Sequence, residues 1–84
     1  MRVAQSQGGW VAEVTVNERT ATRHRVSVSA AERDRYGGGD VADIVRRSFE
    51  FLLAREPNTS ILREFDLATI ERYFPDYALA IVER

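Results

Sequence analysis

The chain has 84 residues, of which 30% are charged, with a formal net charge of −1 and no cysteine. A chain of this length makes one small domain that buries only about 60% of its unfolded surface. The absence of cysteine excludes a disulfide, a thiolate nucleophile and a cysteine zinc site. No run approaches the ~18 apolar residues of a membrane span, and the N-terminus lacks the apolar core of a signal peptide. We therefore expect a soluble, cytoplasmic protein in one domain, residues 1–84.

The first 29 residues have the pattern of β-strands. Apolar and polar residues alternate from Trp10 to Val16 and again from Arg23 to Ser29, and residues 2–5 can form a short leading strand. Alternation with β-branched and aromatic residues is typical of half-buried strands. We expect an antiparallel β-meander of two or three strands. Its buried face would carry Trp10, Val14, Val26 and Val28, and its exposed face Glu13, Thr15, Arg23, Arg25 and Ser27.

Residues 30–84 have the pattern of helices. Ser29 and Glu32 form a capping box that starts a short helix through about Tyr36, and the triple glycine of residues 37–39 ends it. Asp40 is the expected N-cap of a central helix over about residues 40–55, which Pro57 ends. The apolar tail predicts further short helices over 61–65, 67–74 and 77–82. The fold class is α+β, with a meander followed by three to four helices.

The central helix is unusually apolar around its circumference. At about 100° per residue its apolar arc spans about 200°, whereas a surface helix needs a stripe a little over about 100° wide. We therefore expect this helix to be covered on two sides, by its own domain and by a second chain. The predicted protein interface consists of Phe51 and Ile44 on the second flank, with Arg47 at the rim.

This arrangement predicts a non-enzymatic protein-interaction module or small accessory subunit. Small domains without disulfides are often stabilised by oligomerisation, so the expected partners are a second copy, in a homodimer, and another protein. The process in which such a module acts is not encoded in any motif of the sequence.

The alternative is a DNA-binding regulator or an antitoxin. The segment bearing Arg23, Arg25 and Ser27, followed by a short helix, glycines and the central helix, resembles ribbon-helix-helix DNA-binding proteins. That resemblance implies a homodimer in which the arginine-bearing strand enters the major groove. Three features oppose it: the first helix is short, a preceding strand would occupy the edge needed for dimerisation, and the net charge is slightly negative.

A second resemblance covers roughly residues 24–77. The segments FEFLLAREPNTSILREFDL, from Phe49, and IERYFP, from Ile70, resemble a group of small bacterial proteins with no assigned activity. The resemblance implies strands followed by helices and supplies no catalytic residues.

Catalytic, cofactor and metal sites are not expected. The single histidine, His24, has no partners at ligand spacing and is interpreted as filling a strand face. The triple glycine lacks the Gly-Lys-Ser/Thr ending of a phosphate-binding loop, and the carboxylates lie at helix caps or on polar helix faces. The sequence predicts no small-molecule substrate.

Overall fold

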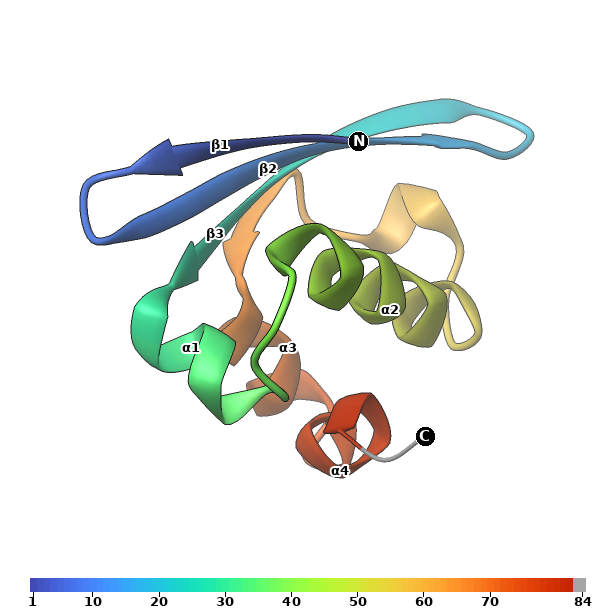
Figure 1. Cartoon of the computed structure of the whole chain (residues 1–84). Helices are drawn as coiled ribbons and strands as arrows, with labels where there is room; N and C mark the ends of the chain where they lie inside the picture. The colour runs from blue at the N-terminus through green and yellow to red at the C-terminus, as the bar shows by residue number, and fades with distance from the viewer. Residues whose placement is uncertain (83–84) are drawn as a thin grey trace.

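The computed structural model describes residues 1–82 and consists of a sheet with helices packed beneath it (Figure 1). The strands are β1 (Arg2–Ser6), β2 (Gly9–Asn17), β3 (Ala21–Ser29) and β4 (Glu64–Asp66). The helices are α1 (Ala30–Arg35), α2 (Val41–Leu53), the 3-10 turn η1 (Asn58–Ser60), α3 (Leu67–Tyr73) and α4 (Tyr77–Val82). The α+β class and the order of strands before helices are confirmed, apart from β4.

The first three strands form the predicted antiparallel meander, and the sheet order is β1-β2-β3-β4. β2 and β3 alternate buried and exposed residues, with Val14, Val26 and Val28 buried against the helices and Trp10 partly buried beside them. The predicted inward face is therefore confirmed. Glu13, Thr15, Arg23, Arg25 and Ser27 lie on the outer, exposed face.

The fourth strand departs from the prediction. A helix was expected over residues 61–65, but the chain forms η1 and then β4, which pairs in parallel with β3. β4 is only three residues long, and its register pairs Val26 with Phe65. Pairing between such distant parts of the chain outweighs the local helix signal, because a short strand is stabilised by its neighbours and not by its own sequence.

The helix boundaries follow local signals. Ser29 and Glu32 form the predicted capping box, with Ser29 accepting a hydrogen bond from the Glu32 amide and Glu32 accepting one from the Ser29 amide. Asp66 caps α3 by accepting from the Thr69 amide at 2.9 Å. Asp40 occupies the N-cap position of α2, but its side chain makes no capping hydrogen bond there. Its contribution is limited to the favourable effect of negative charge at a helix N-terminus.

α2 is wrapped by its own chain. Ile44 and Val45 are fully buried, and Phe51 is only 8% exposed. The Phe51 ring packs edge-on against Phe74 and Tyr77, at centroid distances of 5.8 and 5.3 Å. The prediction of an uncovered flank on this helix is therefore wrong. The C-terminal tail folds back and supplies the cover that the sequence analysis assigned to a second chain.

Substitutions of Phe51 therefore test whether this side chain packs inside the chain. We expect Phe51→Ala to lower the free energy of unfolding by about 3–5 kcal/mol, because it leaves a cavity under Phe74 and Tyr77, and Phe51→Asp to unfold the protein. Urea denaturation followed by circular dichroism measures both. The control is Tyr73→Ala, because the Tyr73 side chain is 68% exposed. Its free energy of unfolding should stay within about 0.5 kcal/mol of the wild-type value. A folded Phe51→Asp protein with the wild-type midpoint would contradict this assignment.

A polar cluster joins α1 to α3. Arg35 donates two hydrogen bonds to the Glu71 carboxylate, at 3.0 and 2.7 Å, and the Tyr36 hydroxyl donates a third at 2.7 Å. These bonds lower the pKa of Glu71 below its ordinary value of 4.5. Burial, with the hydrogen bond to Glu71, raises the pKa of Tyr36 to about 12. The cluster thus favours the charged carboxylate and the neutral phenol in the folded state.

This cluster should make the free energy of unfolding depend on pH in the acid range. A carboxyl group whose pKa is lowered by folding stabilises the folded state above its ordinary pKa, and the contribution is lost as the pH falls through the folded value. We expect Glu71→Gln to be less stable than wild type at neutral pH, with the difference shrinking below the ordinary pKa of 4.5. Urea midpoints at neutral pH and at about pH 3 measure it. A difference that is independent of pH, or that is matched by the exposed control Glu50→Gln, would contradict it.

Candidate functional site

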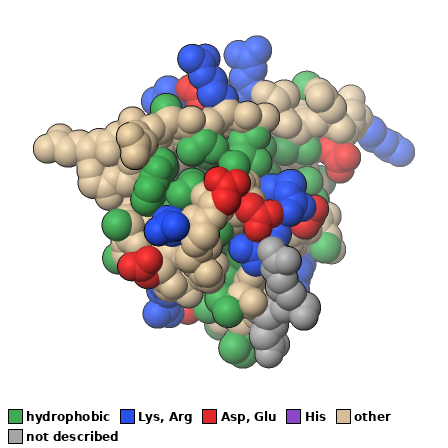
Figure 2. Space-filling view, in the orientation of Figure 1, with side chains coloured by type: hydrophobic (Ala, Val, Ile, Leu, Met, Phe, Trp, Pro, Cys, Tyr) green, Lys and Arg blue, Asp and Glu red, His purple; other side chains and the backbone are tan. Residues whose placement is uncertain are grey.

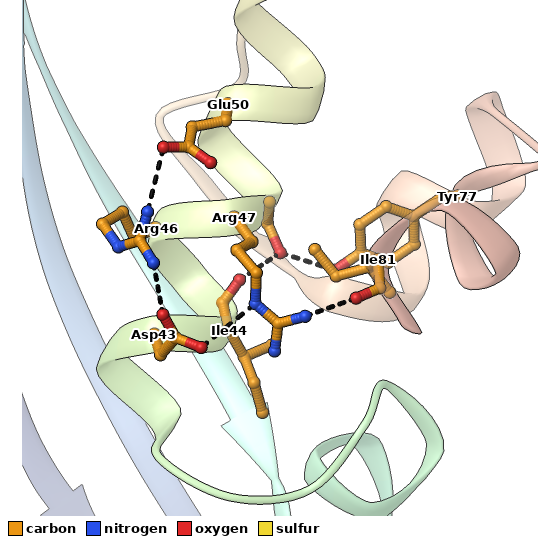
Figure 3. Close-up of polar contacts among 8 residues, drawn as sticks. Asp43, Ile44, Arg46, Arg47, Glu50, Tyr77 and Ile81 are labelled. Carbon is orange, nitrogen blue, oxygen red and sulfur yellow. Dashed lines mark hydrogen bonds and ion pairs between the residues drawn. The ribbon is translucent and has the colours of Figure 1, made fainter. Parts of the chain in front are cut away.

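Arg47 lies inside the fold and clamps α2 to α4 (Figure 3). Its side chain is 17% exposed, and its Nε lies 3.1 Å from the Asp43 carboxylate. Its terminal nitrogen donates to the backbone carbonyl of Ile81, in the last turn of α4, where a cation also complements the helix dipole. Ser48 and Tyr77 add a buried hydroxyl contact of 2.6 Å between the same two helices. Arg47 is therefore a clamp within the chain and not the predicted rim of an interface.

The neighbouring arginine has a different environment. Arg46 is 55% exposed and forms ion pairs with Asp43 and Glu50 along the surface of α2 (Figure 3). The two adjacent arginines thus offer a matched comparison between an internal and a surface contact.

Replacing Arg47 should cost more stability than replacing Arg46. We expect Arg47→Met to lower the free energy of unfolding by about 1–3 kcal/mol, because the Ile81 carbonyl loses its donor while the apolar stem is kept. Arg46→Met should have a clearly smaller effect, since exposed ion pairs contribute little. Urea denaturation of both variants measures this, and equal losses would refute the clamp.

The outer face of the sheet carries the predicted nucleic-acid residues. Arg23, Arg25 and Ser27 lie together on the exposed side of β3, and Figure 2 shows arginines projecting from this side of the molecule. However, Arg25 lies between Glu13, with which it pairs at 3.3 Å, and Glu64. Because Glu13 also faces Arg2, charges of opposite sign alternate across the sheet. The two arginines and two glutamates that lie side by side across the four strands therefore balance each other's charge.

The ribbon arrangement implied by the ribbon-helix-helix resemblance is not found. β3 is paired on both edges, with β2 on one side and β4 on the other. β4 covers residues 25–27, the segment that bears Arg25 and Ser27, so the central part of this edge is closed to a second copy.

A groove of about 400 Å³ lies between the C-terminal end of α2, the connection from η1 to β4, and α3. Its volume falls within the range of binding sites for small ligands or inserted side chains. Most of its lining is apolar: Leu52, Ile61, Leu62, Phe65, Ile70, Tyr73 and Phe74, with Glu56, Ser60 and Thr69 as the polar members. Leu62 is 48% exposed and Tyr73 68% exposed, so both present apolar surface to solvent at its rim.

One wall of this groove is fixed by buried polar contacts. The His24 ring, 3% exposed, donates from Nδ1 to the Leu62 carbonyl at 2.7 Å, and its Nε2 lies 2.9 Å from the Thr22 hydroxyl. The Asn58 amide donates to the Thr20 carbonyl at 2.7 Å and to the Thr22 hydroxyl at 2.9 Å. Residues 58–62 are thus anchored beneath the β2–β3 hairpin. His24 fills a strand face, as expected, and also positions Leu62.

Sequence reasoning did not identify the groove. Its lining residues were recognised only as members of a dense apolar tail, and the exposure of Leu62 and Tyr73 depends on how that tail folds. Residues 61–63, predicted as part of a helix, form an irregular connection that leads into β4, and no local pattern in the sequence indicates this.

The described residues contain neither a metal-binding group of side chains nor a membrane-spanning helix. Across residues 1–82, no three His, Asp or Glu side chains are grouped so that they could hold a metal ion. Over the same range, no helix combines the length and apolar character needed to cross a lipid bilayer.

The structure is a small α+β domain with a mostly apolar groove, one wall of which is anchored by hydrogen bonds to the β2–β3 hairpin. No protein-family model, curated protein or solved structure matches this chain. The two sequence resemblances therefore gain no support from these comparisons.

Proposed function

We propose that the protein is a non-enzymatic interaction module that binds a segment of another protein in the groove between α2 and α3. The observation that carries this is the pair of exposed side chains, Leu62 and Tyr73, above a floor that includes Leu52, Ile61 and Ile70. Apolar surface that is contiguous and exposed marks sites of interaction. The anchoring of Leu62 through His24 supports this, since a pre-formed wall lowers the entropic cost of binding.

A homodimer belongs to this proposal only through a different surface from the one expected. Ile44 and Phe51 are buried within the chain, and Arg47 is bonded to Ile81. Self-association through the groove is therefore treated as one outcome of the experiment below. A cytoplasmic location remains part of the proposal and rests on the sequence expectations alone.

A DNA-binding regulator or antitoxin is the weaker candidate. It is favoured by the shared exposed face of Arg23, Arg25 and Ser27. It is opposed by the alternating charges around Arg25, because affinity for DNA depends on neutralising phosphates with uncompensated basic side chains. The groove therefore remains the better supported surface.

The groove can be tested with charged substitutions at its rim. We expect the double variant Leu62→Glu/Tyr73→Glu to retain the wild-type fold and to lose at least about tenfold of its affinity for a bound partner, since each buried apolar side chain contributes about 1.5–3 kcal/mol. Leu79→Glu is the matched control: Leu79 is 69% exposed but lies on α4, outside the groove.

The measurement is quantitative capture of partners from a lysate of the source organism, followed by mass spectrometry, with sedimentation velocity of each purified protein. Loss of a captured protein with the double variant but not with Leu79→Glu supports the proposal. A wild-type dimer that only the double variant dissociates would identify a second copy as the occupant. Identical capture and sedimentation for all three proteins would remove the groove as the binding surface.

A further inference from the structure

The groove contains one charged side chain, Glu56, among its lining residues. Glu56 follows the end of α2 and is half-buried. Among residues 1–82, no side chain forms a hydrogen bond or ion pair with its carboxylate, and its backbone amide donates to the Leu52 carbonyl. A carboxylate at the side of an apolar groove is therefore left without a cation.

The nearest arginine in sequence does not supply that cation. Arg55 lies over the Phe51 ring at 3.6 Å, donates to the Phe51 carbonyl at 3.0 Å and contacts Asp76 at 3.4 Å. These contacts direct it toward the Phe51 side of α2. Arg72, on α3, is not among the residues that line the groove, and its guanidinium contacts the Thr69 hydroxyl at 3.5 Å.

From this charge pattern we infer that the partner segment carries an arginine or lysine next to its apolar residues, and that Glu56 pairs with it. The inference rests on the proposed function and names the chemistry of the partner. Apolar side chains would fill the space above Ile61, Ile70 and Phe65, and the flanking cation would reach Glu56. A charge pair at the edge of an apolar contact is shielded from water more than a surface pair, so it contributes to affinity and to specificity.

The experiment selects binders from a random twelve-residue peptide library displayed on phage, using the full chain as bait. Enriched peptides are synthesised with a fluorescent label and titrated by anisotropy, each beside a copy in which its basic residue is replaced by glutamine. Three proteins are compared: wild type, Glu56→Gln and the control Glu50→Gln. Glu50 is 64% exposed and pairs with Arg46 on the polar face of α2.

We expect the enriched peptides to combine apolar residues with a neighbouring arginine or lysine. Replacing that basic residue should weaken binding to wild type and to Glu50→Gln by about tenfold at low salt, and by less than about twofold for Glu56→Gln. Added salt should reduce the wild-type affinity toward that of Glu56→Gln.

The outcomes separate the inference from the proposed function. Peptides that lose affinity for Leu62→Glu/Tyr73→Glu but bind wild type and Glu56→Gln equally would overturn the role of Glu56 and leave the groove intact. A library that yields no peptide dependent on Leu62 and Tyr73 would overturn both.

Discussion

The fold depends on covering a helix that is apolar around more than half of its circumference. The sheet covers one side of α2, where Phe49 packs against His24 and Phe65. The C-terminal segment covers the other side, where Phe74 and Tyr77 enclose Phe51. A domain of this size has little apolar surface to spare. Its short terminal helices are therefore committed to α2, and the tail leaves Leu62 and Tyr73 open to solvent.

That division of the tail explains how an exposed apolar groove can coexist with a closed core. The floor of the groove belongs to the core, because Leu52, Ile61 and Ile70 are buried. Its rim does not, and the rim is held by the contact of His24 with the backbone of Leu62. Leu62 thus lies in a connection that is anchored to the sheet by hydrogen bonds, and such anchoring lowers the entropic cost of the binding proposed above.

The sequence predicted what depends on neighbours along the chain. The capping box of Ser29 and Glu32 and the alternation in β2 and β3 are local, and the structure contains both. It did not predict β4, whose three residues are a strand only because β3 lies beside them. The width of the apolar arc on α2 was estimated correctly, but the source of its cover was not. A sequence pattern measures how much surface must be buried, not which segment buries it.

The sheet has two free edges, and both are short. β1 has five residues and begins with Arg2, and β4 has three before the chain turns into α3 at Asp66. Strand edges expose unpaired backbone groups that can template aggregation or fibril growth, and short, charged edges suppress this. The long strand β3 pairs with β2 along its whole length, and β4 covers residues 25–27 of its other edge. The two short outer strands therefore offer few unpaired backbone groups for strand addition, although the apolar side chains of Leu62 and Tyr73 are exposed.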